Sequence, residues 1–475
     1  MQEVDVKALP LEQLTSILGD ERAQRSMEAA VRARAAFGDR TIWHVNATAQ
    51  GGGVAEMLQT LLAYGKGAGI ENRWLVLRGV PEFFATTKRL HNMLHGSPGD
   101  GGALGQSERD LYEEVLADNL ARMLPLVAER DIILLHDPQT AGLVAGLQAN
   151  GNRVAWRCHV GSDTQNEQTD LAWAFLRPYI EHADAVVFSR KEYAPDWLAA
   201  DRLVVIAPSI DPFSAKNREL DPATVSAILG TTGLVSGADP DGPIEYVRRT
   251  GAGAIVRSHD DLIVDGPPPP HDVRLVLQVS RWDRLKDMAG VMRGFVRAVE
   301  DGPVDTHLML VGPDVSGVTD DPEGAEVLAE CREIWASLPD SIRNLVHLAC
   351  IPMDDVDENA IIVNALQRHA YAVVQKSLVE GFGLTVTEAM WKARPMVASG
   401  IGGIQDQIVD GRDGLLLADP YDIDAFAALL RRLLTDTELA DRLGAAARAR
   451  VMDEFLGDRH LQQYVELFSR LSRMG

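Results

Sequence analysis

Two glutamates, Glu380 and Glu388, are separated by seven residues in the segment EGFGLTVTEAMW. Two carboxylates in one segment can act as an acid and a base. On a continuous helix, however, eight residues span about 12 Å, which suits opposite ends of an extended ligand better than one shared small group. Gly381 and Gly383 would expose backbone amides beside the first carboxylate. Taken singly, Glu388 could instead favour a helix dipole, and Glu380 could be a surface loop residue.

A second candidate group follows the segment RLVLQVS, where the chain continues as RWDRLK. Arg281 and Lys286 are cations five residues apart, and they suit a diphosphate: Arg can bind two oxygens at once and Lys acts as a point charge. On their own, such residues are more often surface ion pairs in a solvated loop.

The third candidate is the glycine run in NATAQGGGVAEML, formed by Gly51, Gly52 and Gly53. Here a predicted strand turns into a helix that should open at about Val54. Such a turn lets backbone amides approach an anion at a helix N-terminus. A plain tight turn is the alternative.

The elements that must position these residues form two series of short apolar runs. The first series is TIWHVNAT (41 to 48), RWLVLRG (73 to 79), DIILLHD (131 to 137), NRVAWRCHV (152 to 160), DAVVFS (184 to 189) and RLVVIAPS (202 to 209). The second is RLVLQVS (274 to 280), HLMLVG (307 to 312), LVHLAC (345 to 350), AYAVVQKS (370 to 377), MVASG (396 to 400) and GLLLAD (414 to 419). Helical patterns separate them, so both series predict parallel sheets built from βαβ units.

The fold prediction is therefore α/β, with two Rossmann-like, doubly wound domains that face a cleft. We expect ligands to bind outside the carboxyl ends of the strands. The predicted boundaries are 1–210 for the first domain, 211–272 for a linker and insertion rich in Gly, Pro, Ser and Asp, and 273–452 for the second domain. We expect the helix at 453–475 to pack back on the first domain.

Composition excludes several classes of partner. With 475 residues and a formal net charge of -23, the chain would repel nucleic acids and anionic membranes. The three cysteines lack zinc-binding spacing, no acidic metal cluster is evident, and neither a signal peptide nor a run of eighteen apolar residues occurs. We expect a cytoplasmic protein without a bound metal.

The segments VSRWDRLK and EGFGLTVTEAMW, followed by VASGIGGIQDQIVDGRDGLLL, resemble the donor-site motifs of retaining GT-B glycosyltransferases related to bacterial glycogen synthase and sucrose synthase. Within that family, further segments look like the glycosyltransferring trehalose synthases: HVNATAQGGGVAEML, EFFATTKRLHNMLHG, HDPQ, WRCHV and PSIDPFSAKN. The related trehalose phosphorylases share several of them.

The resemblance implies roles for the donor site. Glu388 would bind the ribose hydroxyls of a nucleotide sugar, and Glu380 would hold the transferred glucose together with the amides of Gly381, Phe382, Gly383 and Leu384. Arg281 and Lys286 would neutralise the departing diphosphate. Gly51, Gly52 and Gly53 would close on the phosphates from the first domain.

It also implies residues on the acceptor side. His159 matches the family histidine that contacts the donor sugar, although a lone histidine is more often structural. The plausible acceptor-pocket residues are Glu82, Lys88, Asn92, Asp137 and Gln139.

The implied reaction moves glucose from a nucleoside diphosphate glucose, such as ADP-glucose or UDP-glucose, to free glucose and forms trehalose reversibly. The alternatives are a retaining trehalose phosphorylase and a non-catalytic nucleotide-sugar-binding protein. The chemistry would be a front-face displacement rather than the two-carboxylate mechanism. The resemblance implies no bound cofactor. Free Mg²⁺ could assist the reaction, and the protein could form a homodimer. The sequence departs from the family pattern in GSDTQNEQTD after WRCHV, in RLKD, and around residues 230 to 270.

Overall fold

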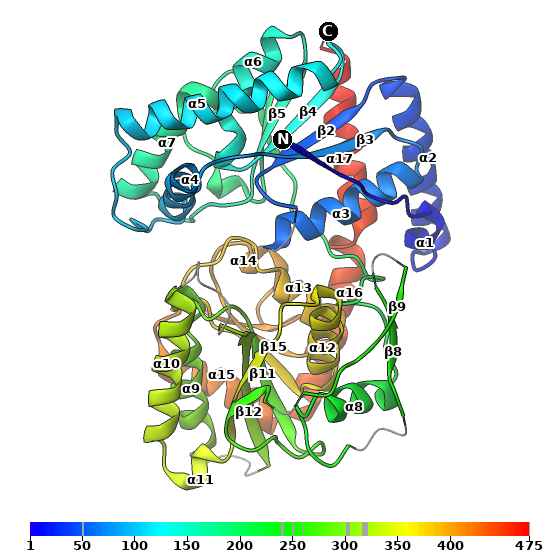
Figure 1. Cartoon of the computed structure of the whole chain (residues 1–475). Helices are drawn as coiled ribbons and strands as arrows, with labels where there is room; N and C mark the ends of the chain where they lie inside the picture. The colour runs from blue at the N-terminus through cyan, green and yellow to red at the C-terminus, as the bar shows by residue number, and fades with distance from the viewer. Residues whose placement is uncertain are drawn as a thin grey trace. The chain divides into compact units, whose positions relative to one another are not determined.

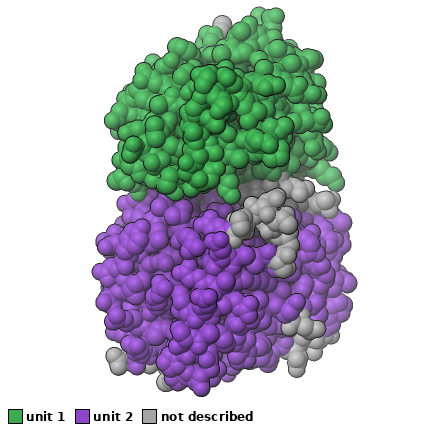
Figure 2. Space-filling model, turned by 60° about the vertical axis from the view of Figure 1, so that its left-hand side comes forward, with its two compact units in different colours: residues 1–209, 455–475 green, residues 210–454 purple. Residues whose placement is uncertain are grey.

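The computed structural model describes residues 1–49, 52–238, 242–248, 251–259, 261–300, 305–315 and 322–474. The contacts divide the chain into two compact units (Figure 2). Unit 1 comprises Met1–Ser209 and Phe455–Gly475, and unit 2 comprises Ile210–Glu454.

Unit 1 contains a seven-stranded sheet in the order β1-β3-β2-β4-β5-β6-β7. Its strands are β1 (Gln2–Val4), β2 (Ile42–Asn46), β3 (Asn72–Val76), β4 (Ile132–His136), β5 (Arg153–Cys158), β6 (Ala185–Phe188) and β7 (Leu203–Val205). All neighbours are parallel except the edge strand β1, which pairs antiparallel with β3.

Helices cover both faces of this sheet. They are α1 (Leu11–Thr15), α2 (Asp20–Phe37), α3 (Gly52–Gly67), α4 (Pro81–Leu94), α5 (Gln106–Met123), α6 (Val144–Ala149), α7 (Glu167–Ile180) and α17 (Gly457–Ser472), with short 3-10 helices that include η2 (Pro138–Leu143). Along β4, Ile133 and Leu135 pack into one apolar cluster, and Ile132 and Leu134 pack into another. Because both faces are buried, the strand is a continuous apolar run.

Unit 2 contains a seven-stranded sheet in the order β10-β13-β12-β11-β14-β15-β16. Its strands are β10 (Ile263–Asp265), β11 (Arg274–Val279), β12 (Thr306–Pro313), β13 (Val346–Ile351), β14 (Ala372–Gln375), β15 (Met396–Ser399) and β16 (Leu415–Leu417), and a separate antiparallel ribbon is formed by β8 (Glu245–Val247) and β9 (Gly253–Ile255). The six parallel strands have the doubly wound Rossmann order, in which the strand order reverses between β11 and β14.

The helices of unit 2 flank that sheet. They are α8 (Pro222–Thr231), η4 (Arg284–Lys286), α9 (Met288–Val299), α10 (Pro322–Ser337), α11 (Asp340–Arg343), α12 (Val356–His369), α13 (Leu384–Trp391), α14 (Ile404–Gln407), α15 (Ile423–Thr435) and α16 (Thr437–Glu454). In the part of the chain that the structure describes, no helix combines the length and the apolar character needed to cross a membrane.

All twelve predicted strands are present, and the two-domain α/β prediction is confirmed. That the two domains face one another across a cleft stays a prediction. The C-terminal helix α17, red in Figure 1, lies beside α2 and α3 in unit 1, and its Tyr464, Leu467, Phe468 and Leu471 are buried there.

Residues 211 to 272 differ from the predicted linker, because they belong to unit 2. The short strand β10 extends the sheet by pairing with β13, and α8 packs on α12. Their Gly- and Pro-rich composition reflects tight turns between three-residue strands, which are too short to show an alternating pattern.

Candidate functional site

A cation and a carboxylate meet at the point of unit 2 where the strand order reverses. Lys286 ends the short helix η4 after β11, Glu380 lies in the loop after β14, and these two strands are neighbours in the sheet. Lys286 Nζ is 2.7 Å from Glu380 Oε2, to which Ser377 Oγ also donates at 3.1 Å. Both side chains are mostly buried, at 15% and 12% exposure. Ligands of doubly wound sheets bind in the crevice at this position.

Buried polar contacts hold the two loops together. Leu378 N donates to Leu285 O at 2.7 Å, and the amide of Gln278 both donates to Lys286 O and accepts from Lys376 N. The Lys376 side chain is fully buried and forms an ion pair with Asp287. Because Asp287 follows Lys286 directly and caps α9, this pair fixes the position of the lysine backbone.

The glycine loop between the two glutamates forms the entrance to α13. Gly383 is the N-cap of that helix with φ 80°, a left-handed conformation that only glycine adopts easily, and it offers no side-chain cap. Gly403 N donates to Gly381 O at 2.8 Å, and Gln407 donates to Phe382 O. A glycine loop at a helix N-terminus is a common binding position for an anionic or hydroxyl-rich ligand.

Glu388 lies in α13 and is 4% exposed. Its Oε1 is 3.6 Å from Lys216 Nζ, and its backbone carbonyl accepts from Lys392 Nζ at 3.1 Å. Lys392 is buried and also donates to Asn217 and Gln367. Burial lowers the pKa of Lys392 to about 7, opposed by the nearby Glu388 carboxylate. The second glutamate is thus a buried carboxylate with a cationic neighbour, not a solvated surface charge.

The predicted diphosphate-binding arginine is the most exposed member of the group. Arg281 is 66% exposed, and its guanidinium donates to Asp283 at 2.8 Å. Three residues later, Arg284 is bound to Glu326 and Glu330 on α10. Arg281 is the more accessible of the two to an anionic ligand, because a single short-range carboxylate among the described residues engages it.

In unit 1, predicted residues gather at the carboxyl ends of β4 and β5. The His159 backbone amide donates to Asp137 Oδ1 at 2.8 Å, and the His159 ring binds that of His136 at 3.0 Å. Asp137 has φ 64°, an uncommon conformation for a residue with a side chain. Burial raises the pKa of Asp137 to about 7 against the opposing effects of the His159 amide and Arg157. Perturbed groups of this kind are frequent at functional sites.

The other predicted acceptor residues do not form one cluster. Glu82, Lys88 and Asn92 all lie on α4, where Lys88 and Asn92 share a face as an i,i+4 pair. Glu82 is six residues before Lys88 and points about 120° away from it. Gln139 lies in η2, partly buried.

Gly51 lies outside the described residues. Gly52 and Gly53 are the first residues of α3, so the helix begins earlier than the expected Val54.

The structure adds residues that the sequence reasoning did not select, namely Ser377, Lys376, Lys392, Lys216, His136 and His44. Three of them stand inside motifs quoted for the family resemblance, namely His44 in HVNATAQGGGVAEML, His136 in HDPQ and Lys216 in PSIDPFSAKN, and Lys376 and Ser377 end the predicted strand run AYAVVQKS. Their motif positions were a usable signal, but their partners lie far away in sequence.

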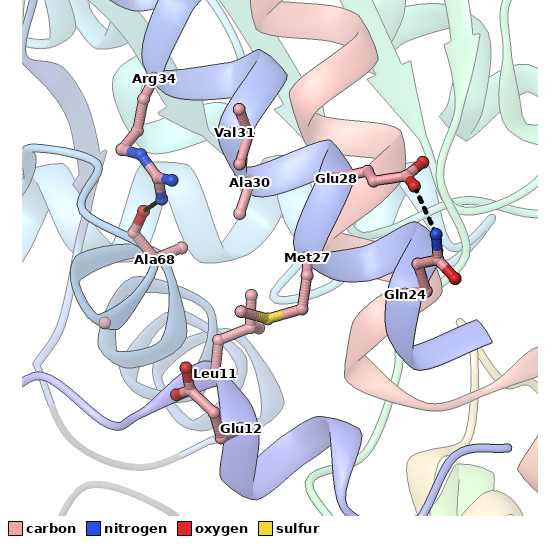
Figure 3. Close-up of a pocket in the computed structure, with 10 residues that line it drawn as sticks. Leu11, Glu12, Gln24, Met27, Glu28, Ala30, Val31, Arg34 and Ala68 are labelled. Atoms are coloured by element: carbon pink, nitrogen blue, oxygen red, sulfur yellow. Dashed lines mark hydrogen bonds between the residues drawn. The ribbon is translucent and has the colours of Figure 1, made fainter. Parts of the chain in front are cut away.

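A separate hollow of about 480 Å³ lies between α1, α2 and α3 of unit 1 (Figure 3). Met27 and Val31 are exposed on its α2 side, and Arg34 donates to the Ala68 carbonyl at 2.6 Å across it. None of the predicted site residues lines this hollow.

The two Rossmann-like units have the fold of the GT-B glycosyltransferases. Solved structures support the fold: a trehalose-6-phosphate synthase (OtsA) matches with a TM-score of 0.67 at 16% identity, covering 92% of this chain and 100% of that one. Residues 357–450 match the family "Glycosyl transferases group 1".

More specific similarity extends over the whole chain. Residues 44–195 match the family "Trehalose synthase, N-terminal domain". A trehalose synthase of Rubrobacter xylanophilus is 35% identical over 99% of this chain and 99% of its own length. A trehalose phosphorylase of Pleurotus pulmonarius is 25% identical over 86% of this chain and 54% of its own length. The chain belongs to the trehalose synthase family.

Proposed function

We propose that the protein transfers glucose from a nucleoside diphosphate glucose to free glucose, with retention at the anomeric carbon, and forms trehalose reversibly. The observation that carries this proposal is the arrangement at the reversal point of unit 2: Lys286 and Glu380 in contact, beside the glycine loop of α13. The full-length similarity to a protein named trehalose synthase supports the choice of substrates.

Each group has a role that its surroundings support. Glu380, oriented by Lys286 and Ser377, would accept hydrogen bonds from the glucose hydroxyls. Lys286 and the accessible Arg281 would stabilise the negative charge that develops on the departing diphosphate. Glu388, with Lys216 beside it, would accept from the ribose hydroxyls.

In this reaction the departing diphosphate takes the proton of the incoming hydroxyl on the same face of the sugar. The protein contributes orientation, charge stabilisation and exclusion of water. Glu380 is already engaged by a cation and a hydroxyl, which favours a holding role over that of a covalent nucleophile. Free Mg²⁺ would assist by screening the diphosphate, and no resident cofactor is needed.

The direct experiment incubates the protein with glucose and with ADP-, UDP- or GDP-glucose, with and without Mg²⁺, and identifies the disaccharide and its anomeric linkage. The α,α-linked product is expected. Another linkage would refute the trehalose assignment, and phosphate-dependent cleavage of trehalose without nucleotide would establish the phosphorylase alternative. Binding of nucleotide sugar with no release of nucleoside diphosphate in the presence of any sugar acceptor would establish a non-catalytic binding protein.

Variants test the residue roles. Glu388→Ala should chiefly weaken nucleotide binding, and Lys286→Ala should chiefly slow transfer. Arg281→Ala should weaken diphosphate binding, whereas Arg284→Ala, a neighbouring arginine held by α10, should not. Equal kinetics for the two arginine variants would contradict the site. Cytoplasmic residence and a homodimer remain predictions, the second measurable by light scattering.

A further inference from the structure

Three histidines from neighbouring strands of unit 1 form a row that ends at His159. His44 lies in β2, His136 ends β4 and His159 follows β5. His44 Nδ1 is 3.2 Å from His136 Nε2, and His136 Nδ1 is 3.0 Å from His159 Nε2. The ring planes are nearly parallel, at 20° and 15°. His44 and His136 are fully buried, and the proposed reaction assigns neither a role.

The surroundings keep these rings uncharged. Burial, with Arg157 nearby, lowers the pKa of His44 to about 3 and that of His159 well below its usual value. Burial lowers the pKa of His136 in the same way, with its two histidine neighbours adding to the effect. Arg157 is itself fully buried, and its guanidinium carries only hydrogen-bond donors.

The other ring near Arg157 confirms this pattern of neutral histidines. Arg157 Nη1 is 3.4 Å from His460 Nε2, and a guanidinium can only donate. His460 Nε2 must therefore be the acceptor, so His460 is neutral and carries its proton on Nδ1. That proton is placed to be donated to Ser209 Oγ, 3.0 Å away.

Because all three rings are neutral and two hydrogen bonds join them, only two sets of tautomers are possible for the row. A neutral imidazole has one donor and one acceptor nitrogen. If His44 donates from Nδ1, then His136 and His159 must also carry their protons on Nδ1; if His159 donates from Nε2, all three carry them on Nε2. The outer nitrogen of the row is His159 Nδ1, which has no hydrogen-bond partner among the residues that the structure describes.

We propose that His136 and His44 are positioning residues that fix the orientation of His159 and tie its tautomer to their own, so that His159 meets its ligand as a neutral ring suited to a sugar hydroxyl rather than to a phosphate. The inference rests on the proposed function for the identity of the ligand. Both positioning residues act through His159 and do not themselves reach its outer nitrogen.

Nitrogen NMR of protein carrying ¹⁵N-labelled histidine tests the row without any substrate. The chain has 12 histidines, and single-histidine variants assign the signals. The three rings should share one protonated nitrogen and stay neutral from pH 8 to pH 5. His136→Phe should turn His159 into a mixture of tautomers, whereas His136→Gln, whose amide can both donate and accept, should preserve one tautomer.

A second histidine pair provides a matched control. His307 Nδ1 and His347 Nε2 are 2.8 Å apart in unit 2, with nearly parallel rings. His347→Phe removes a comparable buried ring and should leave the His159 signals unchanged. A wild-type His159 that protonates near pH 6.5, or one whose signals survive His136→Phe unchanged, would overturn the proposal.

Enzyme kinetics then test the ligand. His44→Phe should lower kcat/KM for glucosyl transfer about two- to twelve-fold, the usual effect of one hydrogen bond, while His347→Phe should not. A common tautomer with no effect of His44→Phe on transfer would refute the positioning role. Absence of transfer in the wild type, with the NMR pattern intact, would instead refute the proposed function alone.

Discussion

Gly403 is the position where a single methyl group should disturb the donor site most directly. It lies in the loop after β15, where its amide donates to Gly381 O. Its φ of -65° and ψ of -8° are ordinary for any residue, so alanine adds no backbone strain. A Cβ there would stand 2.7 Å from Phe382 Cα and 3.0 Å from Gly381 O. The effect of Gly403→Ala is therefore purely steric.

The size of the effect follows from those distances. Ordinary contacts of a Cβ begin at 3.4 Å, so the Phe382 backbone must move by about 0.7 Å. Overpacking of this kind costs about 1–3 kcal/mol. That corresponds to about a 5- to 150-fold change in an equilibrium constant and, for a unit of this size, to a fall in Tm of about 2–12 °C.

Calorimetric titration with UDP or ADP and a thermal melt measure the two consequences. Gly400→Ala is the matched control, because its added Cβ would lie 3.3 Å from Leu417 O and 3.8 Å from Leu416 Cβ. We expect Gly403→Ala to bind nucleotide more weakly and to melt earlier than this control. Equal values for both variants would refute the steric reasoning, and an earlier melt with unchanged affinity would remove the 381–384 loop from the donor site.

Three further predictions concern buried charges. Asp137 binds its proton more tightly in the folded state, where its pKa is raised to about 7, than in the unfolded chain, where the pKa is about 3.9. Its contribution to stability is therefore lost as the pH rises from about 4 to about 7. Asp137→Asn should flatten the pH dependence of the free energy of urea unfolding in that range. Lys392, whose pKa is lowered to about 7, binds its proton more weakly when folded than when unfolded. The stability advantage of the wild type over Lys392→Met should therefore grow from pH 7 to 9.5, and a constant difference would contradict this. Arg22 binds the 1%-exposed Asp458 at 2.5 and 2.7 Å, so Arg22→Met should lower the free energy of unfolding by about 3–5 kcal/mol, whereas exposed Arg25→Met should change it by under about 1 kcal/mol.

Most of the architecture could be read from local sequence patterns. The twelve predicted strands of the two main sheets are marked by apolar runs that need no knowledge of distant residues. The edge strands β1 and β10 and the β8–β9 ribbon were missed, because each strand has three residues and none lies in one of those runs, whereas the equally short β7 and β16 lie in RLVVIAPS and GLLLAD.

The individual site residues were predictable where a motif contained them. Lys286 and Glu380 were selected from separate motifs, and the structure brings them into contact. The faces of α4 show the limit of this reasoning, since Glu82 and Lys88 belong to one motif but point in different directions.

Local chemistry was thus present in the sequence: strand runs, glycine turns and charged residues placed directly after strands. The tertiary structure decided which groups meet. Lys286 and Glu380 are 94 residues apart but follow neighbouring strands, and His44 and His136 are 92 residues apart but lie in neighbouring strands. The apolar pattern along a strand indicates which of its faces is buried, but it does not indicate which strand lies beside it. Only the folded sheets, with β14 next to β11 and β4 next to β2, turn separate motifs into an ion pair and a histidine row.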